Sequence, residues 1–128
     1  QLPRPKQVEL IDSLPKAQLL QHLRSSLALL SSSTEEGFDY PVLEAKAEGI
    51  PTLISDIPVH REFHEGSSLF FPVDDDGEAL AVQVIAFAKD RRLWSQLSKA
   101  SIDLAHHLSV KTQVARINDQ FHHLCRTI

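Results

Sequence analysis

Sulfur-containing and large aromatic residues are scarce in this chain of 128 residues, which has one cysteine, no methionine, one tryptophan and one tyrosine. The single cysteine, Cys125, excludes an internal disulfide and any metal site built from several cysteines. This usage fits a reducing compartment. We therefore expect a cytoplasmic protein, either free or peripheral to the inner face of the membrane.

The chain also lacks a strong charge bias and long apolar runs. Its formal net charge is -4, with both signs mixed along the sequence, which argues against nucleic-acid binding by bulk charge. No apolar run approaches the roughly 18 residues that a membrane-spanning helix needs. Residues 1–6 are polar and proline-rich rather than typical of a signal peptide, so we expect residues 1–7 to be linker-like.

The length and an apolar content of 42% are enough for one globular domain with its own core, over residues 1–128. Short apolar runs alternate with segments of helical periodicity, which predicts an α/β fold with a Rossmann-like parallel sheet flanked by helices. We expect about four strands, at residues 8–11, 27–30, 52–55 and 69–71. The continuous apolar run at 27–30 is typical of a strand buried on both faces.

The expected helices follow from apolar spacing and from start and stop residues. The last of them covers residues 109–128, with Ser109 as a plausible N-cap and an apolar stripe along one face. The stripe residues are Val110, Val114, Ile117, Phe121 and Leu124.

One stretch, residues 36–51, joins two of the apolar runs and carries two glutamates eight residues apart. Glu36 lies at a loop–helix junction, and Glu44 falls in the second turn if the helix begins near Asp39 or Tyr40. Helical side chains lean toward the N-terminal end of the helix, where unpaired backbone N–H groups favour an anion. Two carboxylates beside such an end predict a site for a phosphorylated sugar or nucleotide.

The residues around these glutamates form an ordered set. It resembles the signature of the C-terminal, nucleotide-sugar-binding part of retaining GT-B glycosyltransferases of the group 1 type, with their E-x7-E motif. The resemblance covers residues 8 to 90 and is weaker beyond. The set is Ser33, Glu36-Gly37-Phe38, Pro41, Leu43-Glu44-Ala45, Gly49-x-Pro51 and Asp56-x-Pro58-x-x-Arg61-Glu62.

The resemblance implies roles for individual residues. Glu36 would be the catalytic residue that contacts the donor hexose, and Glu44 would accept hydrogen bonds from the ribose hydroxyls. The diphosphate and hexose would lie on a cradle formed by Gly37, Phe38, Asp39 and Tyr40, with Ser33 beside it. A surface role for both glutamates and a turn role for the Ser33 hydroxyl are the alternatives. No metal and no cofactor besides the donor substrate are expected.

The sequence also departs from the family pattern. Asp39 stands where the family usually has glycine, so it either places a charge beside the diphosphate or caps the helix. Lys46 and Glu48 replace small or apolar residues, and their spacing predicts the outer side of the motif helix. Arg61 fits a surface ion pair better than a site role, and the pair His60 and His64 lacks an evident third ligand for zinc.

By resemblance, two strands of the nucleotide-binding domain, the Arg and Lys that bind the leaving diphosphate, and the acceptor-binding N-terminal domain have no counterpart here. The strands that flank the missing ones would pair directly, leave a gap or recruit another chain. We therefore expect an isolated chain that is inactive and self-associates through exposed edges, by exchange of strands.

The function predicted from this resemblance is retaining transfer of a hexose from a nucleotide-diphospho-sugar to a saccharide or lipid-linked acceptor, with this chain as the donor-binding part. A non-catalytic binding or assembly module derived from the same fold is the first alternative. A nucleotide-sugar epimerase of that fold is the second.

Overall fold

The computed structural model of the protein describes residues 7–127, which form three strands and six helices. In chain order the elements are α1 (Lys16–Ser25), β1 (Leu29–Ser31), α2 (Tyr40–Ala47), β2 (Thr52–Ser55), α3 (Pro58–His64), β3 (Ser68–Phe71), α4 (Glu78–Lys89), α5 (Arg91–His107) and α6 (Val110–Thr127).

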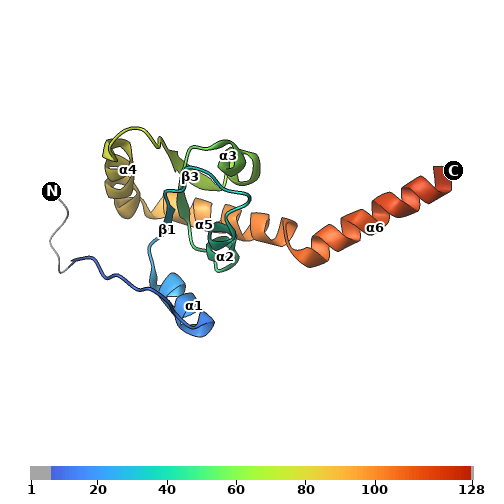
Figure 1. The fold of residues 1–128 in the computed structure, drawn as a ribbon, viewed down its shortest axis with the longest axis horizontal. Helices are drawn as coiled ribbons and strands as arrows, with labels where there is room; N and C mark the ends of the chain where they lie inside the picture. The colour runs from blue at the N-terminus through green and yellow to red at the C-terminus, as the bar shows by residue number, and fades with distance from the viewer. Residues whose placement is uncertain (1–6, 128) are drawn as a thin grey trace.

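The strands form one parallel sheet in the order β1-β2-β3, with α2 and α3 as the two crossovers (Figure 1). Leu30 pairs with Leu53, and Leu53 pairs with Leu69 across the sheet. The central strand β2 is buried along its whole length. The predicted α/β class with a parallel sheet is therefore confirmed, and the expected strand at residues 52–55 has the predicted bounds.

The expected first strand, at residues 8–11, does not form, so the described sheet has three strands rather than about four. Val8, Leu10 and Ile11 are exposed. A short β-type run is stable only where a neighbouring strand accepts its hydrogen bonds. Within residues 7–127 no strand pairs with this segment, so its β propensity is not enough to form a strand.

The run at residues 27–30 is also less buried than predicted. The strand here is β1, Leu29–Ser31, at the edge of the sheet, and Leu27 and Leu30 are 50% and 47% exposed. Full burial of a parallel strand requires helices over both faces and a strand on each side. Within residues 7–127 β1 has one neighbouring strand, β2, so its other edge and part of its apolar run stay exposed.

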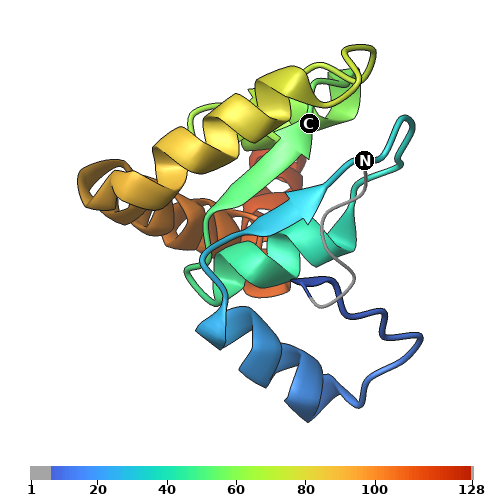
Figure 2. The same cartoon turned by 90° about the vertical axis from the view of Figure 1, so that its left-hand side faces the viewer.

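The core has one cluster on each face of the sheet. Leu53 and Phe71 pack with Phe87 of α4 and Leu97 of α5, and Trp94 of α5 lies against this cluster. Leu23 of α1 packs with Ala45 and Ile50 in the other cluster. Figure 2 accordingly has α4 on one side of the strands and α1 with α2 on the other.

The end of α2 comes close to α5 at Gly49. This glycine follows α2 with a positive φ of 72°, and a Cβ there would lie 3.1 Å from Cδ1 of Ile102. Ser98 donates a hydrogen bond to the Gly49 carbonyl oxygen at 2.7 Å. The positive φ therefore favours glycine here, and an added Cβ would also push the Ile102 side chain away by a few tenths of an ångström.

The edge of the sheet is tied to α5 by Trp94, whose indole Nε1 donates a hydrogen bond to the carbonyl oxygen of Leu27 at 2.8 Å. The bond joins residues 67 apart in the sequence. It fixes the segment that enters β1 against the start of α5.

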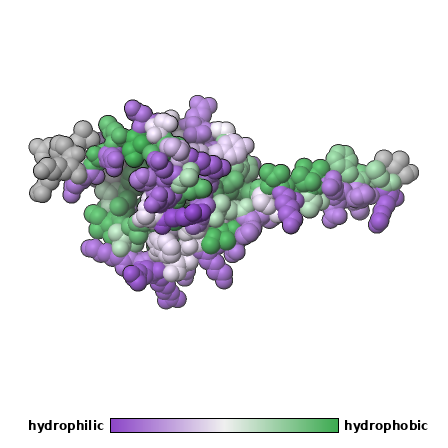
Figure 3. All heavy atoms as spheres, turned by 90° about the horizontal axis from the view of Figure 1, so that it is seen from below, coloured by the Kyte–Doolittle hydropathy of each residue, from purple (hydrophilic) through white to green (hydrophobic). Residues whose placement is uncertain are grey.

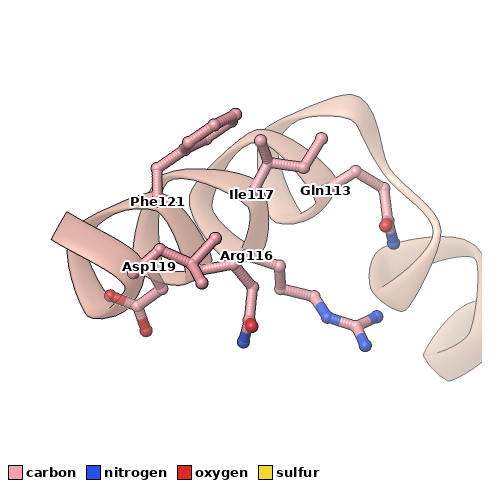
Figure 4. Close-up of a pocket in the computed structure, with 7 residues that line it drawn as sticks. Gln113, Arg116, Ile117, Asp119 and Phe121 are labelled. Carbon is pink, nitrogen blue, oxygen red and sulfur yellow. The ribbon is translucent and has the colours of Figure 1, made fainter. Parts of the chain in front are cut away.

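The last helix, α6, extends away from the rest of the molecule and has no buried residue (Figure 1). Its predicted N-cap is confirmed, since Ser109 Oγ accepts a hydrogen bond from the Thr112 backbone N–H. Figure 3 shows apolar surface along one side of this projecting helix and polar surface along the other. In the close-up of Figure 4, Ile117 and Phe121 border a hollow lined only by α6, so it is a surface feature of one helix rather than an enclosed site.

None of the helices within residues 7–127 is both long and apolar enough to cross a membrane.

We predict that Phe87→Ala lowers the free energy of unfolding by about 3–5 kcal/mol, because the 2% exposed ring leaves a cavity in the core. The matched variant Phe121→Ala, at a ring that is 63% exposed, should change it by less than about 0.5 kcal/mol. Urea unfolding followed by circular dichroism measures both.

A loss above about 2 kcal/mol in Phe121→Ala that grows with protein concentration would contradict the free α6 face, because it would mean that a second copy covers the stripe.

Candidate functional site

The loop that carries Ser33, Glu36 and Gly37 lies at the carboxyl edge of the sheet, where ligands bind in open α/β folds. The loop after β1 runs from Ser32 to Asp39 and leads into α2. The segment that follows β2 leaves the same edge, because the strands are parallel. The Glu36 loop leads directly into α2, so the loop and the start of this helix both lie at this edge.

The motif helix begins at Tyr40, so the predicted start near Asp39 or Tyr40 is confirmed and Glu44 lies in the second turn. Pro41 in the first turn has no N–H to leave unpaired, which suits a helix start. Asp39 is the N-cap and adopts the left-handed conformation, with φ 60° and ψ 69°. Aspartate is one of the few residues other than glycine that tolerates this region.

The Asp39 side chain points into the protein and caps the helix, which is one of the two alternatives predicted for it. The residue is 6% exposed. Its Oδ1 accepts from the Val42 backbone N–H at 3.4 Å, and its Oδ2 accepts from Ser31 Oγ at 2.6 Å. The same Oδ2 lies 3.1 Å from Nε2 of His60. The carboxylate therefore lies beneath the loop instead of on its outer surface.

The two motif glutamates are both exposed. Glu36 Oε1 accepts a hydrogen bond from Ser33 Oγ at 2.7 Å. The Ser33 hydroxyl thus orients the first glutamate within the loop, and the Ser33 carbonyl oxygen accepts a hydrogen bond from Ser55 Oγ on β2. This second bond fixes the loop to the central strand.

Open space lies next to Gly37, where an added Cβ would meet no atom within 4 Å. Neither a positive φ nor packing requires glycine here. The next residue, Phe38, anchors the loop, since its ring packs edge-on against Phe63 of α3 with 4.9 Å between centroids. Tyr40 is exposed. The loop is thus anchored on α3 through Phe38, while the space beside Gly37 stays open.

Lys46 is not on the outer side of the motif helix, as its spacing predicted, but fully buried. Its Nζ donates to the carbonyl oxygen and Oγ of Ser67 at 2.6 and 2.9 Å, and to Ser68 Oγ at 2.9 Å. Burial lowers the pKa of Lys46 to about 7. The prediction failed because the hydroxyl and carbonyl partners lie on β3 and just before it, far away in the sequence.

Glu48, the other predicted outer residue, is partly exposed and pairs with Arg24 of α1. This contact links α1 to the end of α2. The side chain of Arg24 is mostly exposed, so the pair adds little to stability.

His60 and His64 do share one face of α3, but that face is buried rather than open to a ligand. The nitrogens of His64 have no hydrogen-bond partner among the described residues. Burial is the main cause that lowers the pKa of His64 to about 4, and the nearby Lys46 and His60 contribute to the same shift. These two histidines and Lys46 form a polar interior that the sequence alone did not indicate.

Arg61 forms the predicted surface ion pair. Its guanidinium donates two hydrogen bonds of 2.7 Å to the Asp56 carboxylate and lies 4.0 Å above the centre of the Phe70 ring. The Arg61 guanidinium lowers the pKa of that carboxyl. Both side chains are more than two-fifths exposed, so the pair orders the start of α3 without forming a buried site.

The sequence profile of a family described as Glycosyl transferases group 1 matches residues 1–103, which is most of the chain. The chain belongs to this family. The match includes the loop after β1, the motif helix and all three strands.

The chain is also similar to the O-antigen chain mannosyltransferase RfbU of Salmonella typhimurium. The two sequences are 41% identical over 49 residues, which is 38% of this chain and 14% of that protein. The similarity therefore covers a small part of the relative's length.

We predict that the free energy of unfolding rises with pH because of Lys46. Its pKa is about 7 in the folded protein against an ordinary value of 10.5. Between these values the unfolded chain binds a proton here that the folded chain does not, so stability increases with pH across this window. Relative to Lys46→Met, the wild type should gain up to about 1.4 kcal/mol per pH unit in urea unfolding at pH 7, 8 and 9.

The control is Lys99→Met, at an exposed lysine of α5, which should keep the wild-type pH dependence. Equal pH slopes for the wild type and Lys46→Met would contradict the buried position of Lys46.

His64 should make the protein sensitive to mild acid. The pKa of His64 is lowered from 6.5 to about 4, so between these values unfolding takes up a proton and stability falls as the pH falls. His64→Leu removes this proton uptake. Thermal or urea unfolding at pH 6.5, 5.5 and 4.5 should show the wild type losing up to about 1.4 kcal/mol per pH unit relative to the variant.

His122→Leu, at an exposed histidine of α6, serves as the matched control and should follow the wild type. The prediction is wrong if His64→Leu loses stability in acid as steeply as the wild type does.

Proposed function

We propose that this chain is the donor-binding part of a retaining GT-B glycosyltransferase, which transfers a hexose from a nucleotide-diphospho-sugar to a saccharide or lipid-linked acceptor. Membership of the group 1 family supports glycosyl transfer as the reaction class. The name of the similar Salmonella protein, a mannosyltransferase, makes mannose a reasonable donor sugar to test first.

The observation that carries the proposal is the pair of exposed glutamates on either side of the start of α2, at the carboxyl edge of the sheet. A diphosphate is favoured at this helix start by unpaired backbone N–H groups and the helix dipole. Open space beside Gly37 lets a ligand approach the backbone closely.

In this site Glu36 contacts the hexose and offsets positive charge that develops at the anomeric carbon in the transition state. Ser33 orients Glu36 through their hydrogen bond. Glu44 accepts hydrogen bonds from the ribose hydroxyls, and charge-assisted bonds of this kind are strong. The backbone of Gly37, Phe38, Asp39 and Tyr40 forms the cradle for the diphosphate and hexose.

We further propose that the isolated chain binds the donor without turning it over. No residue of the sequence corresponds to the Arg and Lys that the family uses for the leaving diphosphate, and no acceptor-binding domain is included in the 128 residues. The reaction then requires further parts of a longer protein, in the cytoplasm or at the inner face of the membrane.

The test is an NMR titration of the 15N-labelled chain with UDP, GDP and ADP and their hexose conjugates. We expect saturable shifts between Ser33 and Glu44 for one base. Glu44→Gln should weaken binding of the nucleotide about tenfold, because one charged hydrogen-bond acceptor is lost. Glu36→Gln should weaken only the hexose conjugate.

Glu35→Gln, next to the motif in the same exposed loop, is the matched control and should bind like the wild type. A folded spectrum with no shifts for any nucleotide would sink the donor-binding proposal and favour a non-catalytic module. Turnover of the donor without an acceptor would instead indicate an epimerase.

A further inference from the structure

His60 is fully buried between β2 and the start of the motif helix. Its Nδ1 lies 2.8 Å from the carbonyl oxygen of Ser55 and 3.2 Å from Ser55 Oγ. On the other side of the ring, Nε2 lies 3.1 Å from Oδ2 of Asp39. Both ring nitrogens are therefore within hydrogen-bond distance of oxygen atoms.

The first nitrogen must carry a hydrogen. A carbonyl oxygen can only accept, so Nδ1 has to donate to Ser55. The Ser55 hydroxyl cannot reverse this, because it already donates its hydrogen to the Ser33 carbonyl oxygen. Nδ1–H is the form that these contacts select.

The second nitrogen faces a carboxylate that already accepts two other hydrogen bonds. Asp39 accepts hydrogen bonds from Ser31 Oγ and from the Val42 backbone N–H. It also caps the positive end of the α2 dipole. Hydrogen bonds to a carboxylate favour its charged state, and a charged carboxylate can only accept. His60 Nε2 must then donate as well.

We propose that His60 is a buried imidazolium that neutralises Asp39, and that it is thereby a positioning residue for the diphosphate cradle of Gly37 to Tyr40. This inference rests on the proposed function, because the diphosphate is that of the nucleotide-sugar donor. The pair His60–Asp39 has no net charge. An anion above the loop therefore meets the helix dipole without the repulsion of a free carboxylate beneath it.

The other titratable groups of this interior are His64 on α3 and Lys46 on α2. The His64 ring centre lies 6.1 Å from that of His60. Burial above all, and then the neighbouring Lys46 and His60, lower the pKa of His64 to about 4, so His64 is the neutral member of the cluster. In this cluster the His60 imidazolium pairs with the Asp39 carboxylate, and His64 stays neutral.

The neutralisation of Asp39 by His60 also stabilises the left-handed backbone conformation of Asp39. Asp39 has a positive φ of 60°, which costs an ordinary residue free energy and persists here because its side chain is bonded to three elements. Without the proton on His60 Nε2, the ring nitrogen and the carboxylate would repel each other. The loop would then leave this conformation.

The first experiment is a long-range 1H–15N correlation spectrum of the histidine rings in the full chain at pH 7. We expect His60 to show both ring nitrogens protonated. In Asp39→Asn the partner is neutral and can donate, so His60 should become a neutral ring with hydrogen on Nδ1 only. A singly protonated His60 in the wild type overturns the proposal, whatever the chain binds.

The second experiment measures pyrophosphate binding by calorimetry in the same chains. His60→Gln leaves Asp39 uncompensated and should weaken pyrophosphate binding on the order of tenfold. The double variant Asp39→Asn with His60→Gln removes the charge and should recover most of this loss. Asparagine tolerates the left-handed conformation, so the double variant keeps the cap.

The outcomes separate the two proposals. If His60 is an imidazolium but His60→Gln binds pyrophosphate as the wild type does, the positioning role is wrong and donor binding stands. If the wild type binds neither pyrophosphate nor any of the nucleotides, the proposed function fails, and the role of His60 toward a diphosphate fails with it. Recovery in the double variant is the result that supports both.

Discussion

The carboxylate of Asp39 is the contact on which the site depends, because it joins three elements at one point. It accepts from Ser31 in β1, caps α2 through the Val42 N–H and faces His60 in α3. Its left-handed backbone turns the loop so that the side chain points inward. The exposed glutamates can flank the helix start only while this turn is kept.

Local signals were enough to predict the parts of the fold that lie next to each other in the sequence. The start of α2, the end at Gly49 and the strand at Thr52–Ser55 follow from a cap, a glycine and an apolar run. The exposed positions of Glu36 and Glu44 also follow from the loop–helix junction. In each case the deciding interaction lies within a few residues.

The rest could not be predicted because its causes are distant in the sequence. Lys46 is buried because residues 21 and 22 positions later supply its hydrogen-bond partners. Residues 8–11 have β propensity but no strand beside them within the described residues. The pairing of Asp39 with His60 spans 21 positions, and no local signal in the sequence links the two residues.

The tryptophan bond at the sheet edge gives the molecule a built-in optical reporter. Trp94 is the single tryptophan of the chain, and it bonds the carbonyl oxygen of Leu27 just before β1. Its emission wavelength therefore reports the hydration of this one edge. It does not report on the loop at the opposite end of the strands. Fluorescence changes on adding a ligand to the chain would mean that the β1 edge itself has rearranged.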